Sequence, residues 1–238
     1  MPMNESTRHN DLLKAFTDAR CPICAMVLRD LKQDLDILLL ERINKVPTHE
    51  AFRAGRGLCN AHAHQLTKAR GGAPAIAVMY ESTMVEFMKD LAKVKASGGG
   101  LNRFIGKKSL GVIASNQLEP TGACLICDIM NKNEASYVNI VAENVQDAQL
   151  MEAFEKSVGG VCLPHGRMVM AECSQADDLQ AFMSLQVPKW QDLHADLKLY
   201  IKHNDENVPQ HKMGKEGDSW SRSIRYLSGE DNVFGYRR

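Results

Sequence analysis

Aromatic residues are scarce in this chain, and neither sign of charge is in excess. Phe, Tyr and Trp make up 6% of the 238 residues, and 29 Lys and Arg residues balance 29 Asp and Glu residues. A protein that binds a nucleic-acid duplex usually carries a basic excess that displaces counterions, and single-strand binding relies on aromatic stacking. The composition therefore disfavours nucleic-acid binding, and we expect no nucleic-acid partner.

Long apolar runs are also missing. No stretch of roughly 18 or more apolar residues occurs, so we expect no membrane insertion. The polar residues 1–11 lack the apolar core of a secretory signal. We expect a cytoplasmic protein, in which thiols stay reduced. Paired cysteines there are metal ligands or redox groups more often than structural disulfides.

The apolar residues that are present follow a helical period. They recur at steps of three and four, and the two-residue alternation of a half-buried strand is absent. The sequence therefore predicts an all-α fold, with helical stretches at residues 25–44, 74–92, 125–143, 148–157, 178–202 and 218–227. We expect Pro188 to kink or divide the fifth stretch, and the Met-rich stripe of the second stretch to pack in the core.

Six of the seven cysteines fall in a pattern that occurs twice. Each copy is a Cys-x-x-Cys pair followed, after 34 residues, by Cys-x-x-His: Cys21, Cys24, Cys59 and His62 in the first half, and Cys124, Cys127, Cys162 and His165 in the second. Each residue of the second set follows its counterpart by 103 residues, and Gly57 and Gly160 correspond in the same way. Identical spacing in two copies predicts an internal duplication with a shared chemical role.

These ligand types predict two metal sites per chain. Three thiolates and one imidazole form a closed tetrahedral set that suits zinc and leaves no open position for a reacting water. The negative charge of three thiolates could be offset by nearby helix N-termini. Sulfur-rich tetrahedral sites also admit iron–sulfur clusters, and metal-free redox thiols are a further alternative.

Two ligand pairings are compatible with the spacing. In the first, each half closes its own site, which requires residues 45–59 to return over the roughly 30 Å that a straight helix at residues 25–44 would cover. In the second, Cys21 and Cys24 meet Cys162 and His165 across the two halves. We expect the first pairing, with one Cys₃His site in each half.

The repeats define the predicted domain organisation. Residues 1–97 form the first helical repeat with its metal site, residues 98–120 a Gly-containing linker, and residues 121–203 the second repeat with its site. Residues 204–238 form a polar C-terminal tail segment with one short helix. The fold expected from this organisation is two pseudo-equivalent helical halves and a C-terminal helical segment.

Other residues carry weaker signals. His64 follows His62 but is expected to be exposed to solvent, and Cys173 is expected to be a buried structural thiol. In the tail, Trp220 and Tyr226 form an apolar group with Ile224 and Leu227 nearby. Such a group is typical of an interface anchor, and it is equally compatible with a tail that folds back onto its own helices.

The two motif pairs resemble those of a prokaryotic family of unknown function that has duplicated Cys-x-x-Cys and Gly-x-Cys-x-x-His elements. Trp190 and the run from Leu197 to His203 are similar to the last long helix of that family. The closing segment of the family is similar to the run from Glu216 to Trp220 together with Arg222, Ile224 and Gly229. After His203 the family tends to have an acidic–aromatic–Arg run, whereas this chain has Asn204-Asp205-Glu206-Asn207. The resemblance implies an all-helical fold and the eight metal ligands, and it implies no activity.

The function expected from the sequence follows from closed metal sites without a catalytic constellation. We expect a zinc-stabilised, non-catalytic adaptor or accessory subunit of a larger cytoplasmic assembly, with a protein partner whose identity the sequence does not give. The composition is also compatible with a homo-oligomer. The alternative is a redox protein that uses iron–sulfur clusters or cysteine thiols at the same ligands.

Overall fold

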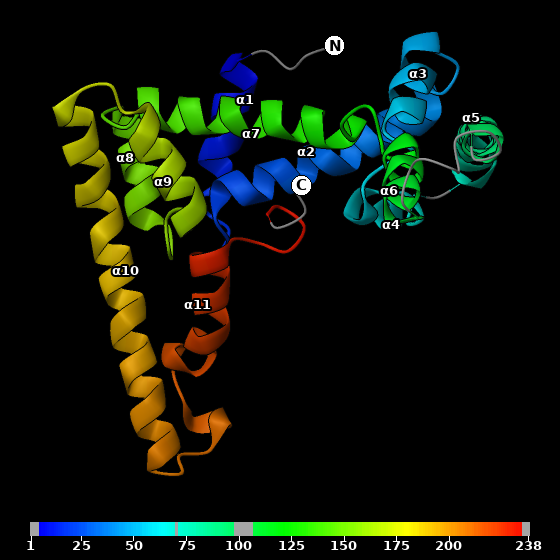
Figure 1. The fold of residues 1–238 in the computed structure, drawn as a ribbon. Helices are drawn as coiled ribbons and strands as arrows, with labels where there is room; N and C mark the ends of the chain where they lie inside the picture. Colours follow the sequence, from blue (N-terminus) through cyan, green and yellow to red (C-terminus); the bar gives the residue numbers. More distant parts are fainter. Residues whose placement is uncertain (1–4, 70, 98–106, 235–238) are drawn as a thin grey trace. The chain divides into compact units, whose positions relative to one another are not determined.

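The computed structural model describes residues 5–69, 71–97 and 107–234, and within them every regular element is a helix (Figure 1). The elements in chain order are α1 (Glu5–Ala15), α2 (Pro22–Ile37), the π-helix η1 (Leu38–Arg42), α3 (Val46–Ala54), α4 (Asn60–Leu66), α5 (Ala73–Ser97), α6 (Lys107–Leu118), α7 (Leu125–Glu143), α8 (Ala148–Lys156), α9 (Leu163–Glu172), α10 (Ala176–Asp205), the 3₁₀ helices η2 (Gln210–Lys212) and η3 (Lys215–Asp218), and α11 (Ser219–Ser228). The all-α prediction is confirmed. None of these helices is both long and apolar enough to cross a membrane.

The chain forms two compact units. Unit 1 consists of residues 1–30 and 131–238, and unit 2 consists of residues 31–130. Helices α2 and α7 each begin in one unit and end in the other, because residues 30 and 131 fall inside them. The units therefore do not coincide with the two sequence repeats, whose boundaries stay a prediction from the motif spacing.

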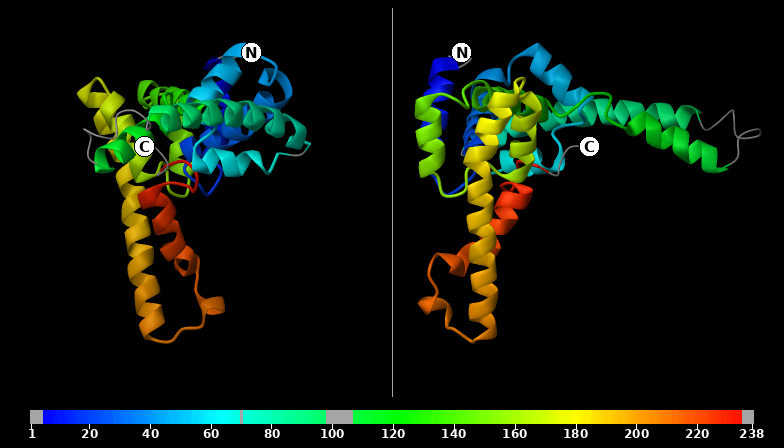
Figure 2. Two further views of the ribbon diagram at one scale, coloured as in Figure 1. Left: turned by 45° about the vertical axis from the view of Figure 1, so that its right-hand side comes forward. Right: turned by 90° about the vertical axis from the view of Figure 1, so that its left-hand side faces the viewer.

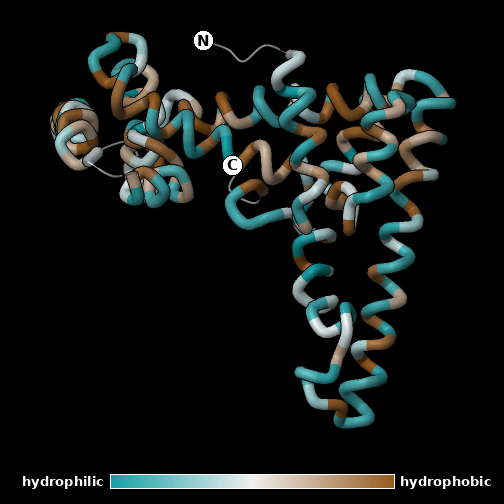
Figure 3. The backbone as a smooth tube through the Cα atoms, turned by 180° about the vertical axis from the view of Figure 1, so that it is seen from behind, coloured by the Kyte–Doolittle hydropathy of each residue, from teal (hydrophilic) through white to brown (hydrophobic). Residues whose placement is uncertain are grey.

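Unit 1 is built around fully buried aromatic rings. The Phe154 ring of α8 lies 5.1 Å from Phe16, which follows α1, and 6.0 Å from Phe182 of α10. Helix α11 lies alongside the middle of α10 (Figures 1 and 2). Hydrophobic and hydrophilic residues are interspersed along the whole length of α10, as expected of a helix with one buried face (Figure 3).

In unit 2, α3 packs on α5. The rings of Phe52 and Tyr80 meet edge to face with centroids 5.0 Å apart. The carbonyl of Ala54, at the end of α3, accepts hydrogen bonds from the backbone N–H groups of Thr121 and Gly122 at 2.9 and 3.0 Å. These bonds fix the segment that leads into Cys124. Residues 98–106 of the predicted linker lie outside the described residues, and α6 occupies most of the remainder and packs on α5.

Two expectations from the helical pattern differ in part from the structure. Of the kink or division expected at Pro188, the division does not occur, because α10 is one continuous helix through that residue. Proline removes one backbone hydrogen bond from a helix, and the packing of α10 against α8 and α11 offsets that loss. The Met-rich stripe of α5 is not wholly a core feature, because Met79 is fully buried whereas Met84 and Met88 are 54% and 55% exposed.

Candidate metal centres

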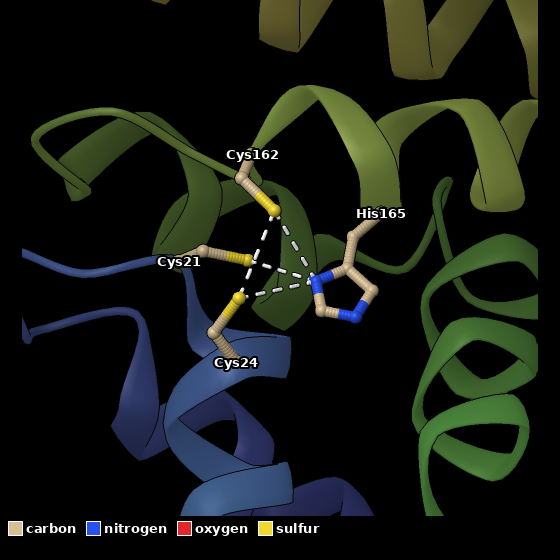
Figure 4. Close-up of side chains that lie close together, drawn as sticks. All are labelled: Cys21, Cys24, Cys162 and His165. Carbon is tan, nitrogen blue, oxygen red and sulfur yellow. Dashed lines mark hydrogen bonds between the residues drawn. The ribbon is translucent and has the colours of Figure 1, made fainter. Parts of the chain in front are cut away.

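Site A lies in unit 1, where two helix N-termini meet (Figure 4). Cys21 immediately precedes α2, and Cys24 lies in the first turn of that helix. Cys162 is the N-cap residue of α9, and His165 lies in its first turn. All four side chains are buried, and their ligand atoms lie within 4.8 Å of one another.

The distances within site A are short and similar. The Nδ1 atom of His165 lies 3.5 Å from the sulfur of Cys21, 3.4 Å from that of Cys24 and 3.3 Å from that of Cys162. The sulfurs of Cys24 and Cys162 are 3.7 Å apart. The imidazole nitrogen of His165 therefore lies beside the neighbouring Cys162 sulfur and beside two sulfurs, those of Cys21 and Cys24, that are 144 and 141 residues away in the sequence.

Site B has the same composition and lies in unit 2. Cys59 is the N-cap residue of α4, His62 lies in the first turn of α4, and Cys124 and Cys127 frame the start of α7. The Nδ1 atom of His62 lies 3.3 Å from the Cys59 sulfur, 3.6 Å from the Cys124 sulfur and 3.4 Å from the Cys127 sulfur. The sulfurs of Cys59 and Cys127 are 3.7 Å apart.

These distances test whether one metal ion fits. A tetrahedral ion with metal–sulfur bonds of about 2.3 Å and metal–nitrogen bonds of about 2.0–2.1 Å sets S···S edges of about 3.8 Å and S···N edges of about 3.5 Å. The observed 3.7 Å and 3.3–3.6 Å separations match those edges at both sites. Both ligand sets therefore have the size of a single tetrahedral ion.

The expected pairing within each repeat is wrong. Site A combines Cys21 and Cys24 of the first repeat with Cys162 and His165 of the second, and site B combines the remaining four ligands in the same crossed manner. The reason is the path of the chain after Cys24. Helix α2 leads from unit 1 into unit 2, and Cys59 and His62 follow within unit 2, so the chain does not return to Cys24. The eight predicted ligands all fall in the two clusters, and each cluster takes half of its residues from each repeat.

The glycine two residues before each third cysteine has a local structural reason. Gly57 and Gly160 both adopt positive φ angles, +98° and +64°, which side chains rarely adopt. A Cβ atom at Gly160 would also lie 2.5 Å from the Gln186 side chain and from the Phe154 ring. A positive φ angle at this glycine, two residues before the cysteine that precedes a helix, recurs at both sites.

Helix N-termini supply part of the positive charge that three thiolates need. The Cys-x-x-Cys pairs sit at the starts of α2 and α7, and the Cys-x-x-His pairs sit at the starts of α9 and α4. Backbone N–H groups at a helix start are partly positive, so they favour thiolates over thiols. The expectation that helix N-termini lie beside the ligands is confirmed.

The pKa values of two site A thiols are shifted in opposite directions by their neighbours. Burial raises the pKa of the Cys21 thiol, but hydrogen bonds with Cys162, Cys24 and His165 outweigh burial and hold that pKa well below its usual value. The pKa of the Cys24 thiol is raised, because its sulfur hydrogen-bonds with Cys162 and Cys21 and is buried beside them. Neighbouring sulfurs thus compete for negative charge, and a divalent cation would let all of them ionise.

Site A has an additional buried partner that sequence reasoning missed. The Nε2 atom of His165 lies 3.1 Å from a carboxylate oxygen of Glu134, and both side chains are buried. Contacts with Cys162, Cys21 and Glu134 outweigh burial and raise the pKa of His165 well above its ordinary value. A carboxylate on the second nitrogen fixes the ring orientation and strengthens the first nitrogen as a ligand. The sequence signal was an acidic residue at helical spacing within the apolar stripe of Ile126, Met130 and Tyr137.

The C-terminal segment covers site A. The Phe234 ring lies against the His165 ring, with centroids 4.8 Å apart. Gly229, which ends α11, lies so close that a Cβ atom there would be 3.8 Å from the Cys162 sulfur. The Tyr226 hydroxyl of α11 donates a 3.0 Å hydrogen bond to the carbonyl of Ala19, two residues before Cys21. The tail therefore covers one of the two candidate metal centres, a role that the sequence did not indicate.

Two weaker sequence predictions are resolved by their positions. His64 is exposed and lies outside both ligand clusters, as expected. Cys173 also lies outside both clusters, but it is half-buried at the end of α9 instead of fully buried as expected.

A comparison with protein-family models identifies the family of this chain. Residues 3–233 match the model of a family of unknown function, DUF6062, so the chain belongs to that family. No curated protein and no solved structure matches the chain significantly. The resemblance drawn from the motifs is therefore confirmed, and the family supplies no activity.

Proposed function

We propose that this DUF6062 member binds two zinc ions as structural cofactors and acts as a non-catalytic adaptor or accessory subunit of a larger cytoplasmic assembly. The observation that carries the metal assignment is the ligand geometry. Two separate sets of three sulfurs and one nitrogen have the edge lengths of a zinc tetrahedron. Six reduced cysteines used as ligands are typical of a cytoplasmic protein.

The same geometry disfavours an iron–sulfur cluster. A cluster of several irons holds its protein ligands farther apart than one ion does, because each sulfur binds a different iron. At both sites all four ligand atoms lie within 4.8 Å of one another, which suits a single ion. The redox alternative therefore depends on the thiols themselves or on a single iron.

A non-catalytic role follows from the closure of the ligand sets. Each site already offers four protein ligands, so a zinc ion there would have no position left for water or substrate. Such an ion contributes to folding, since the unfolded chain has no preformed site. The activity of the protein would then reside in its surface.

Helix α11 is the surface that best supports an adaptor role. Its polar face is turned inward: Arg222 donates hydrogen bonds of 3.0 Å to the buried Asp196 and 2.7 Å to Asp218. Its apolar face is turned outward, with Trp220, Ile224 and Leu227 exposed to 51%, 58% and 61%. The spacing of these three residues puts them on one side of the helix. An exposed aromatic and aliphatic stripe of this kind is typical of a protein interface.

The metal assignment is tested by elemental analysis and an absorption spectrum of protein purified under reducing conditions. We expect about two zinc ions per chain and no visible absorption, because zinc is colourless. Iron with visible absorption bands would support the redox alternative instead.

The adaptor role is tested by co-purification from the native source, comparing the unmodified chain with Trp220→Ala. A protein that co-purifies with the unmodified chain should bind it directly when both are purified, and should bind Trp220→Ala more weakly. The matched control is Ser221→Ala, next to Trp220 on the same helix. Catalytic turnover or reversible electron uptake by the chain alone would contradict this proposal.

A further inference from the structure

The two metal centres have the same ligands but different surroundings. All four ligands of site A are buried, whereas in site B only His62 is buried and the three cysteines are partly exposed. Access of water and small reagents to the sulfurs therefore differs between the sites. Reactivity of a zinc-bound thiolate follows its exposure, so the cysteines of site B are the more reactive set.

The surroundings of the two histidines also favour tighter metal binding at site A. His165 of site A is held by Glu134, and a carboxylate of this kind strengthens metal binding. The residue that corresponds to Glu134 in the first repeat, 103 residues earlier, is Leu31. A leucine cannot accept a hydrogen bond, so the duplicated pattern provides the supporting carboxylate only once.

The tail adds a third difference. Phe234 and Gly229 lie against His165 and Cys162 of site A. The C-terminal segment occurs once in the chain, so only one of the two sites can have this cover. Site A is thus buried, supported by a carboxylate and closed by the tail, while site B has partly exposed sulfurs and no second tail.

We propose that site B is an oxidant-sensitive zinc site, at which a peroxide converts Cys59 and Cys127 into a disulfide and releases the ion while site A keeps its own. These two sulfurs are 3.7 Å apart, within reach of the roughly 2.05 Å S–S bond after a small movement. Cys124 and His62 would remain as only two ligands, too few to hold zinc tetrahedrally. The proposal rests on the zinc occupancy proposed above.

The chemistry balances with hydrogen peroxide as the oxidant. One thiolate attacks the peroxide O–O bond, forming a sulfenic acid and releasing hydroxide. The second thiolate attacks the sulfenic sulfur, forms the S–S bond and displaces a second hydroxide. Two electrons pass from the two sulfurs to the peroxide, and zinc leaves as Zn²⁺ with its oxidation state unchanged. A dithiol reductant reverses the step and restores the ligands.

The test adds hydrogen peroxide to the full-length, zinc-loaded chain in the presence of a chromogenic zinc chelator. We expect one equivalent of zinc to be released at least tenfold faster than the second. Peptide mass spectrometry at the end of the fast phase should find a disulfide between Cys59 and Cys127, with Cys21, Cys24 and Cys162 still reduced. Reduction followed by added zinc should restore the equivalent that was released from site B.

Release of both equivalents at one rate, or earlier oxidation of the site A cysteines, would overturn the proposal while leaving the structural-zinc assignment intact. Absence of zinc before the oxidant is added would refute the proposed function and this proposal with it. Phe234→Ala tests the cause of the difference. It should speed peroxide-driven release from site A severalfold and leave the fast phase of site B unchanged. An unchanged slow phase would show that the tail does not protect site A.

Discussion

The crossed ligand pairing can be tested by combining ligand substitutions in two ways. Cys21→Ser with Cys162→Ser changes two ligands of site A, whereas Cys21→Ser with Cys59→Ser changes one ligand of each site. The first double variant should retain about one zinc ion per chain, because unit 2 keeps a complete ligand set. The second should retain none. Native mass spectrometry counts the ions directly.

The magnitude follows from what a structural ion contributes. Zinc binding supplies about 10–16 kcal/mol of apparent free energy in small zinc domains, which is comparable to the roughly 5–15 kcal/mol that stabilises a typical domain. The unit that loses its ion should therefore unfold. Because Cys21→Ser already releases the ion of site A, adding Cys162→Ser should lower the free energy of unfolding little further. Adding Cys59→Ser should lower it by as much again, since the effects of substitutions at sites with no shared ligand are additive within about 0.3–0.5 kcal/mol.

Cys173→Ser is the matched control, because this cysteine belongs to neither cluster, and it should retain two ions. The opposite pattern, with one ion left in the Cys21/Cys59 variant and none in the Cys21/Cys162 variant, would refute the crossed pairing. That result is what closure within each repeat requires.

Three further predictions concern the surroundings of the sites. Glu134→Leu should weaken zinc binding at site A by about 10–100-fold in a chelator competition titration, and Glu134→Gln by less, because the amide oxygen still accepts a hydrogen bond from His165. Trp220→Ala should leave the melting temperature unchanged, whereas Tyr226→Phe should lower the free energy of unfolding by about 0.5–1.5 kcal/mol through loss of its hydrogen bond to Ala19; thermal and urea unfolding measure the two effects. Gly160→Ala should destabilise the chain by more than about 1 kcal/mol because of the positive φ and close contacts at that position, while Gly111→Ala, in open space on α6, should stabilise it by up to about 1 kcal/mol. Equal effects of the two substitutions in urea titrations would contradict the structural role given to the glycine before Cys162.

Much of the helical architecture was predictable because long helices carry a strong periodic signal. The stretch 125–143 coincides with α7, and the long C-terminal stretch lies within α10. The short helices α4 and α9 were not predicted individually. Each has ten residues or fewer and begins at a metal ligand, so its start depends on the site more than on its own apolar period.

The identity of the metal ligands was predictable because it depends on local spacing, but their pairing was not. A Cys-x-x-Cys turn brings two sulfurs together whatever the rest of the chain does. Which third and fourth ligands join them depends on where the intervening helices lead. Between Cys24 and Cys59, helix α2 leads the chain from unit 1 into unit 2. No local sequence pattern in the first repeat indicates that the chain takes this path.

The orientation of the C-terminal helix α11 also depends on contacts that are distant in the sequence. The sequence grouped Trp220 with Tyr226, but the structure separates them: Tyr226 is buried, whereas Trp220 lies with Ile224 and Leu227 on the exposed face of α11. An apolar face usually turns inward. In α11 the inward face is fixed instead by Tyr226 against Ala19 and by Arg222 against Asp196. These partners lie 207 and 26 residues away, so no local pattern could reveal them. The tail thus folds back onto unit 1 through Tyr226 and Arg222, and this docking leaves Trp220, Ile224 and Leu227 exposed.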